Sequence, residues 1–217
     1  MRSYRQYCSV AKALDVVGDR WTLLIVRELL LQGGCRYTDL ASGLPGIATN
    51  LLTERLRELE AVGLVRREDA PPPVATTLYY LTDDGYQLLP VVTALGQWGA
   101  RFMTAPDGDE VFRSHWLAFP VAEFLRDSAP EQPGVSIEIR TADQPVVVEI
   151  AGGQVRARIG TDPDPDLVLT GDPPLILGLL TKQLSLAQAR RRGLRTSGAT
   201  GVLDRLRVDL DARALTS

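Results

Sequence analysis

The hydrophobic positions in the first part of the chain recur at helical spacing and predict four short helices. Val10, Leu14 and Val17 mark the first, and the mostly apolar run over 21–31 marks the second, which stops at a pair of glycines. A third helix covers residues 38–44 and ends at a Pro-Gly pair. The fourth, near residues 48–62, carries apolar residues on one face and has a glycine at its C-terminal cap position; those apolar residues are Leu52, Leu56 and Leu59.

Two short runs after the fourth helix predict a β-hairpin. Residues 64–68 and 76–81 have strand character and flank a loop with three consecutive prolines. Thr82 can then N-cap a last helix that runs toward Phe102. We expect Pro90 to kink this helix, because proline removes an internal hydrogen bond.

The second part of the chain mixes strand and helix patterns. Strands are predicted over 135–139, 146–150, 155–159 and 167–169, with Gly152 and Gly153 forming a tight hairpin turn between two of them. Helices are predicted over 113–125, where Pro120 interrupts the pattern, and over 175–184, 185–192 and 199–206. The expected fold class is therefore α+β, with a winged helix-turn-helix followed by a second α+β domain.

A cluster of turn-forming residues separates the two parts. Residues 105–109 read Ala-Pro-Asp-Gly-Asp, which cannot continue a helix. Residues 1–104 carry 11 basic and 11 acidic side chains, whereas residues 105–217 carry 13 and 16. We therefore place a domain boundary there, with domains at 1–104 and 105–217, each long enough to bury a core.

Composition excludes several classes of protein. The chain has 217 residues, a net charge of -3 and 45% hydrophobic residues, which is ordinary for a globular protein. The uncharged apolar run at 21–26, like every other such run, is far shorter than a membrane span, and the charged start is unlike a signal segment. We therefore expect a cytoplasmic protein without membrane association, in which Cys8 and Cys35 are free thiols.

The sequence also lacks the usual signatures of an enzyme. One histidine, His115, excludes sites with two histidine ligands, and we expect it at the surface or between the domains. No phosphate-binding loop, nucleophile motif or metal-ligand cluster stands out. The expectation is thus a protein that is not an enzyme and needs neither cofactor nor metal.

The helix at 48–62 has a polar face that suits nucleic acid. Two short helices joined by a tight turn, and then a hairpin, form a winged helix-turn-helix. Short polar side chains near the start of the second helix, with an arginine one turn later, suit base edges and phosphates. A merely solvated polar face is the alternative. The candidate DNA contacts are Thr38, Thr49, Asn50, Thr53, Arg55 and Arg57, with Arg66 and Arg67 at the base of the wing.

Several segments match a known family in order along residues 7–99. They are CSV at 8–10, ALDVVGDRWTLLI at 13–25, RELL at 27–30, LPGI at 44–47, LTERLRELE at 52–60, GLV at 63–65, YYLTDDG at 79–85, LLP at 88–90 and WG at 98–99. With these segments the first part resembles the HxlR family of bacterial winged-helix regulators, which are DNA-binding homodimers.

The resemblance implies a dimer in which the first and last helices of this part pair across a two-fold axis. It also places Cys8 where family members often carry a reactive thiol in a Cys-Pro-Val motif, but Ser9 replaces the proline here. A redox-sensing thiol and an inert cysteine both remain open, and we favour the inert one. The expected apolar seam of the dimer consists of Leu14, Val91, Leu95, Trp98 and Phe102.

Residues 113–210 are similar to the sterol-carrier-protein-like fold. The segments that carry this likeness are PDLVLTGDPP at 165–174, the apolar helix at 175–184, LSLAQA at 184–189 and GLRTSG at 193–198. The resemblance implies a small α+β layer around an apolar ligand tunnel, although each apolar residue concerned is also an ordinary core residue. The candidate lining residues are Trp116, Phe119, Phe124, Val148, Ile150, Leu177, Leu180 and Leu184.

These observations favour a homodimeric transcriptional regulator that binds a double-stranded DNA operator and responds to a small hydrophobic ligand in its second domain. One alternative is a thiol-based redox sensor that acts through Cys8. Another is a lipid carrier that retains a vestigial DNA-binding module.

Overall fold

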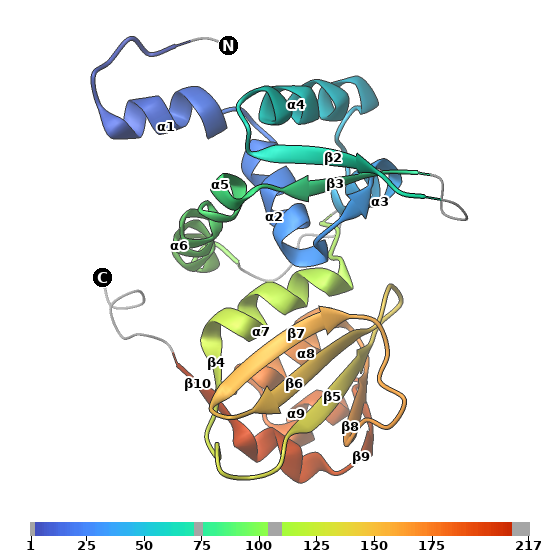
Figure 1. The fold of residues 1–217 in the computed structure, drawn as a ribbon. Helices are drawn as coiled ribbons and strands as arrows, with labels where there is room; N and C mark the ends of the chain where they lie inside the picture. The colour runs from blue at the N-terminus through green and yellow to red at the C-terminus, as the bar shows by residue number, and fades with distance from the viewer. Residues whose placement is uncertain (1–2, 72–75, 104–109, 210–217) are drawn as a thin grey trace. The chain divides into compact units, whose positions relative to one another are not determined.

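The computed structural model describes residues 3–71, 76–103 and 110–209 (Figure 1). The chain divides into two compact units, Met1–Ala100 and Arg101–Ser217, and each unit has its own β-sheet. The expected hinge at 105–109 lies outside the described residues. Within the described ranges, no helix is both long enough and apolar enough to cross a membrane.

The first unit consists of helices around a small sheet. Its three strands are all antiparallel and lie in the order β1-β3-β2. The elements are α1 (Ser9–Val17), α2 (Thr22–Gln32), β1 (Cys35–Arg36), α3 (Tyr37–Gly43), α4 (Thr49–Ala61), β2 (Val65–Asp69), β3 (Thr77–Leu81), α5 (Asp83–Tyr86) and α6 (Leu89–Ala100).

The helices and the hairpin of the first unit agree with the sequence pattern, but the expected last helix does not form as one piece. Thr82 caps α5 as expected: its hydroxyl accepts a hydrogen bond from the backbone N–H of Gly85 at 3.1 Å. The chain then leaves the helix at residues 87–88 and α6 begins at Leu89. Pro90 therefore does not kink a long helix. It stands in the first turn of α6, where a missing N–H costs no internal hydrogen bond.

The second unit is a mixed sheet of seven strands with helices. Strands β5 and β8 are parallel to each other, and the other pairs are antiparallel, in the order β10-β4-β7-β6-β5-β8-β9. The elements are η1 (Ser114–Leu117), α7 (Ala118–Phe124), β4 (Leu125–Asp127), β5 (Val135–Arg140), β6 (Val146–Ala151), β7 (Gln154–Ile159), β8 (Leu167–Thr170), α8 (Pro173–Leu180), α9 (Leu186–Arg191), β9 (Arg195–Gly198), η2 (Thr200–Arg205) and β10 (Leu206–Val208).

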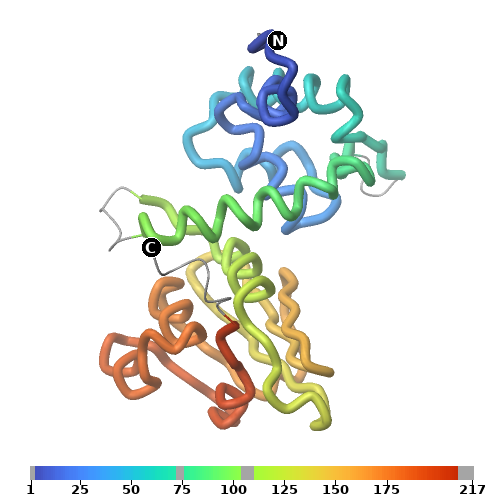
Figure 2. The backbone as a smooth tube through the Cα atoms, turned by 90° about the vertical axis from the view of Figure 1, so that its left-hand side faces the viewer, coloured from blue at the N-terminus to red at the C-terminus, as the bar shows by residue number. Residues whose placement is uncertain are grey.

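One face of this sheet is covered by helices, and the other carries charged side chains beside the buried Val147. Helices α8 and α9 lie against one face (Figures 1 and 2), where apolar side chains from the strands and helices form a single core cluster. On the other face Glu149, Arg156 and Arg158 are exposed. The predicted turn at Gly152 and Gly153 joins β6 to β7, and both glycines have positive φ, at 56° and 82°. The expected α+β class is therefore confirmed.

Several boundaries in the second unit differ from the prediction. The helix expected over 113–125 is a 3₁₀ turn, η1, followed by α7; Pro120 is the third residue of α7 and does not interrupt it. The helix expected over 175–184 runs from Pro173 to Leu180, and the one expected over 199–206 is the 3₁₀ segment η2. Strands β4, β9 and β10, of three or four residues each, were not predicted.

A buried ion pair joins distant parts of the second unit. The guanidinium of Arg205, in η2, donates from Nε to Oδ1 of Asp127 at 3.1 Å and from Nη2 to Oδ2 at 2.8 Å. Arg205 also donates to the carbonyl oxygens of Pro133 and Ala129. The Asp127 carboxylate accepts backbone N–H groups from Ala129 and Gly153. The two charges are thus compensated out of water, and the bonds lower the pKa of Asp127, that of Arg205 contributing most.

We predict that Arg205→Ala lowers the free energy of unfolding by about 3–5 kcal/mol, because it leaves the Asp127 carboxylate buried without its partner. The matched control is Arg158→Ala, which breaks a pair with Glu149 that is nearly half exposed on both sides and should cost less than about 1 kcal/mol. Urea unfolding of the full chain, followed by circular dichroism, measures both.

The same pair predicts a pH dependence. Because pairing lowers the pKa of Asp127 in the folded state, its stabilisation is complete above the ordinary aspartate pKa and is lost as the pH falls through the lowered value. If Arg205→Ala and Arg158→Ala lowered the free energy of unfolding equally at neutral pH, the stabilising role of the buried ion pair would be contradicted.

Candidate DNA-binding surface

Helices α3 and α4 form the helix-turn-helix. A turn over residues 44–48 joins them, in which the N–H of Ile47 donates to the carbonyl oxygen of Leu44 at 3.1 Å. Gly46 in this turn has φ of 87°, a conformation that side chains other than glycine rarely adopt. The turn therefore fixes the direction in which α4 starts.

Helix α4 has a buried face and a polar face, as its sequence predicts. Leu52, Leu56 and Leu59 are at most 3% exposed and anchor the helix in the core of the first unit. Asn50 and Arg57 are exposed on its solvent side. Ala48 at the N-cap makes no side-chain hydrogen bond to the first turn. The amino end of α4 thus presents backbone N–H groups as well as polar side chains, an arrangement that suits an anion.

A tyrosine that sequence reasoning did not single out holds the start of α4. The Tyr37 hydroxyl, at the start of α3, donates to the carbonyl oxygen of Thr49 at 2.7 Å. The Thr53 hydroxyl lies 3.0 Å from the same carbonyl and 3.3 Å from the Tyr37 oxygen. Thr53 is therefore engaged within the protein, whereas Thr49 and Thr38 have exposed side chains.

The two wing arginines are tethered by their neighbours. The Arg66 guanidinium lies 4.6 Å from the centroid of the Tyr80 ring and pairs with Glu68. Nε of Arg67 lies 3.2 Å from a carboxylate oxygen of Glu60. Both arginines are exposed on β2. To contact a phosphate, each guanidinium would bind it beside its carboxylate partner or in place of that partner.

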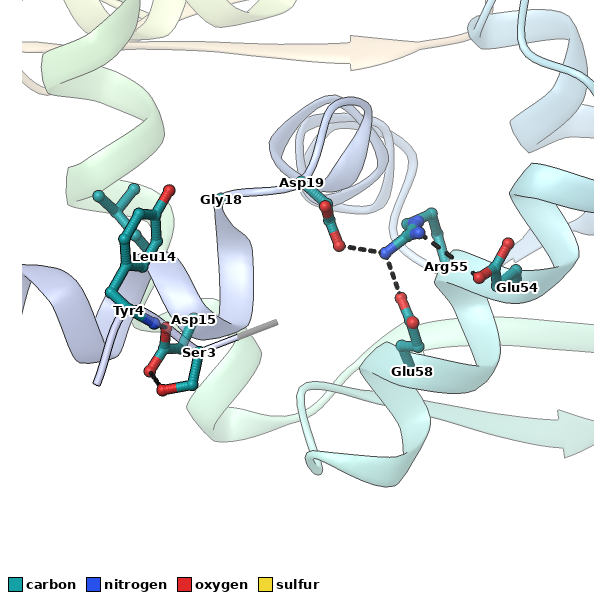
Figure 3. Close-up of a pocket in the computed structure, with 9 residues that line it drawn as sticks. All are labelled: Ser3, Tyr4, Leu14, Asp15, Gly18, Asp19, Glu54, Arg55 and Glu58. Carbon is teal, nitrogen blue, oxygen red and sulfur yellow. Dashed lines mark hydrogen bonds and ion pairs between the residues drawn. The ribbon is translucent and has the colours of Figure 1, made fainter. Parts of the chain in front are cut away.

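Arg55 lies elsewhere than the other candidate DNA contacts. Its side chain is 13% exposed, and its guanidinium pairs with Glu54 and Glu58 of α4 and with Asp19 from the corner between α1 and α2 (Figure 3). A guanidinium that is little exposed and already paired with three carboxylates is poorly placed to bind a phosphate. These ion pairs argue against the predicted DNA contact by Arg55, and we leave it out of the proposed DNA contacts.

These charges border a groove of about 650 Å³ beside α1 and α4. Figure 3 shows the Asp15 carboxylate with Ser3 and Tyr4 on one side and the Arg55 cluster on the other. Ser3 and the backbone N–H of Tyr4 bind Asp15, each at 2.8 Å. Four carboxylates against one guanidinium make the groove acidic, which disfavours contact with DNA phosphates. Its lining residues are Ser3, Tyr4, Leu14, Asp15, Gly18, Asp19, Glu54, Arg55 and Glu58.

An apolar surface remains uncovered on the single chain. All the residues of the expected dimer seam are between 44% and 61% exposed, whereas Val92, the residue of α6 that follows Val91, is 8% exposed. Uncovered apolar side chains of this size favour contact with another protein surface. These exposed residues are Leu14 on α1, Val91, Leu95 and Trp98 on α6, and Phe102.

The candidate ligand-lining residues divide into two sets. Val148, Ile150 and Leu180 are fully buried in the core cluster, and Leu177 packs against it. Trp116, Phe119, Phe124 and Leu184 are partly exposed. His115, expected at the surface or between the domains, is 6% exposed and therefore is not a surface residue.

The two cysteines differ in their surroundings. Cys8 is exposed at the N-cap of α1, where hydrogen bonds from the backbone N–H groups of Ala11 and Val10 lower the pKa of its thiol. Cys35 is buried in β1, and burial, reinforced by Asp39 and Glu28, raises the pKa of its thiol to about 12. Both thiols are free. Among the residues that the structure describes, no group of three or more acidic, histidine or cysteine side chains is placed to hold a metal ion.

Comparison with known proteins bears on the first unit. Residues 16–107 match the family described as HxlR-like helix-turn-helix. The HTH-type transcriptional regulator YvaP of Bacillus subtilis is 36% identical over 92 residues, which cover 42% of this chain and 84% of YvaP. An HTH-type transcriptional regulator of Methanothermobacter thermautotrophicus is 35% identical over 95 residues, covering 44% of this chain and 72% of that protein.

A solved structure is also similar. The reduced form of the transcriptional regulator YodB from B. subtilis is 30% identical, with 47% of this chain and 100% of that chain covered and a TM-score of 0.40. The family assignment rests on the sequence identity to YvaP and on the share of YvaP that the match covers. The chain therefore belongs to the HxlR-like helix-turn-helix family and is a DNA-binding transcriptional regulator.

Proposed function

We propose that α4 enters the major groove of DNA and that Thr49, Asn50 and Arg57 contact bases and phosphates there. The observation that carries this proposal is the exposed polar face of α4 opposite its buried leucines. An amide reaches the edge of adenine and a guanidinium the edge of guanine, so both side chains suit direct readout. Thr38 and the wing arginines Arg66 and Arg67 are proposed to contact the sugar-phosphate backbone.

We further propose that two chains bind DNA together as a homodimer. The exposed apolar residues of α1 and α6 supply the surface that two copies would share. A symmetric pair would place its two α4 helices in major grooves about 34–36 Å apart on one face of the duplex. Small changes in the geometry of the dimer would then prevent both helices from binding at once.

We predict that Asn50→Ala and Arg57→Ala each weaken binding to a duplex selected by the wild-type protein by about 1–3 kcal/mol, because each removes one bidentate base contact. Gel-shift titration at fixed salt measures this. Arg156→Ala, which removes the same charge from the polar face of the second unit, is the control and should leave affinity unchanged. Wild-type affinity in both α4 variants would remove this helix from the groove.

The second unit is proposed to bind a small hydrophobic molecule and thereby to control DNA binding. Supporting this is a partly exposed pair of aromatic side chains: Phe112 packs against the apolar core, and its ring meets that of Trp116 edge to face at 5.8 Å between centroids. The outer face of the sheet mixes arginines with glutamates and so lacks the uniform positive charge of a nucleic-acid surface. A lipid carrier that retains a vestigial DNA module is the competing proposal.

We predict that at least one fatty acid, sterol or aromatic polyketide-like compound raises the melting temperature of the full chain and changes its affinity for DNA. A tenfold change in DNA affinity requires only about 1.4 kcal/mol of preference for one dimer geometry. Thermal-shift and DNA-release assays on the same compounds measure the two effects. Binding without any change in DNA affinity would favour the carrier, and no binding by any compound would remove the ligand proposal.

A redox-sensing role for Cys8 remains the other candidate. Its exposed thiol and lowered pKa favour the reactive thiolate. Against it, Ser9 stands in place of the family's usual proline, and Cys35 is buried with a raised pKa and so makes a poor second thiol. We therefore propose that Cys8 does not control DNA binding.

We predict that Cys8→Ser binds DNA within about twofold of the wild type, because an exposed thiol can be replaced by a hydroxyl with little effect on packing. Gel-shift assays before and after peroxide treatment measure this for both proteins. Peroxide release of the wild type but not of Cys8→Ser would establish the redox role instead. Alkylation under native conditions, in which Cys8 reacts and Cys35 does not, shows that the thiol is accessible to the oxidant.

A further inference from the structure

The charge cluster beside the groove joins α4 to the corner between α1 and α2. Arg55 projects from the side of α4 that faces this corner, and its guanidinium pairs with Asp19, Glu54 and Glu58 (Figure 3). Glu54 and Glu58 belong to α4 itself, so they orient the guanidinium but cannot fix the helix relative to its surroundings. Asp19 is the partner on another element, and the Asp19–Arg55 pair is therefore the bond that links the two.

The corner that carries Asp19 is tightly folded. A Cβ at Gly18 would lie 2.4 Å from the carbonyl oxygen of Leu14, so only glycine fits there without a shift of the backbone. Trp21 has φ of 82°, a left-handed conformation that costs a residue other than glycine free energy. The N–H of Thr22 donates to the carbonyl oxygen of Asp19 at 3.2 Å. Asp19 thus stands on a backbone with little freedom to move.

We propose that Asp19 and Arg55 are positioning residues that set the orientation of α4 for DNA. Helix α1 carries Leu14 of the apolar surface and ends at the corner that holds Asp19. The ion pair connects this corner to α4, the helix that presents Asn50 and Arg57. A change in the position of α1 would therefore move the DNA-contacting face. The inference rests on the proposed placement of α4 in the major groove.

Whether removal of the Asp19 charge raises or lowers the affinity for DNA distinguishes a positioning role from a general electrostatic effect. Asp19 is an acidic residue and 58% of its side chain is exposed. Removing a negative charge from a DNA-binding protein strengthens its attraction to the phosphate backbone, whatever the DNA sequence. If Asp19 instead positions α4 through Arg55, its removal weakens binding to the selected sequence. The two explanations predict opposite changes for the same variant.

The test compares Asp19→Asn with the wild type on two duplexes at fixed salt. One duplex is selected from a random library by the full-length wild-type protein, and the other is a scrambled duplex of equal length. We expect about 5- to 10-fold weaker binding to the selected duplex, in the range of couplings between directly paired residues. Binding to the scrambled duplex should be unchanged or tighter. Asp84→Asn, which removes an exposed acid from α5, is the matched control and should not weaken either.

Two further variants distinguish positioning from loss of fold. Asp19→Glu keeps the charge and should recover part of the affinity for the selected duplex. Arg55→Lys should lose affinity for it, and Asp19→Asn combined with Arg55→Lys should lose no more than the weaker-binding single variant, because both changes break one bond. Melting temperatures, followed by circular dichroism, should stay close to that of the wild type for Asp19→Asn, since the Asp19 carboxylate is 58% exposed and an ion pair made by an exposed carboxylate contributes little to stability.

Unchanged or tighter binding of Asp19→Asn to the selected duplex would overturn the inference, as would losses that add fully in the double variant. An equal loss on both duplexes together with a lower melting temperature would also overturn it, because the role would then be structural. Failure of the proposed placement of α4 is a different result: Asn50→Ala and Arg57→Ala would then bind the selected duplex as the wild type does.

Discussion

The burial of one leucine face of α4 is the constraint on which the DNA-binding surface depends. Leu52, Leu56 and Leu59 have almost no contact with water, and returning them to it would cost about 1.5–3 kcal/mol for each side chain. This anchors the helix and leaves a single face for solvent. Asn50, Glu54 and Arg57 are exposed on that face because helical spacing puts them opposite the leucines.

Anchoring by leucines leaves the precise angle of the helix to polar contacts. At its start, the Tyr37 hydroxyl binds the carbonyl oxygen of Thr49. Further along, Arg55 pairs with Asp19 of the neighbouring corner. Apolar packing is not directional, whereas hydrogen bonds and ion pairs have preferred geometries. The leucines thus hold α4 against the core, and the polar contacts orient it.

In the second unit, too, a polar contact fixes the arrangement of elements that pack around an apolar core. A sheet of seven strands brings together segments far apart in sequence, and its η2 and β4 segments meet through the buried pair of Arg205 and Asp127. Both side chains make further hydrogen bonds, to backbone groups of Ala129, Pro133 and Gly153. Such a network favours one arrangement of the chain, because any other would leave a charge buried without its partner.

The sequence by itself determined the first four helices of the first unit, the hairpin, the Gly-Gly turn of the second unit and the polar face of α4. These follow from local spacing and from glycine conformations, which the chain carries with it wherever it folds. Tertiary structure decided which arginines of α4 are available to contact DNA. Arg55 and Arg57 are two residues apart on one helix and look equivalent in sequence, yet one is neutralised by carboxylates and the other is exposed. Glu54 and Glu58 are local partners on α4. The third partner, Asp19, lies 36 residues away in the chain, and only the fold brings it within reach.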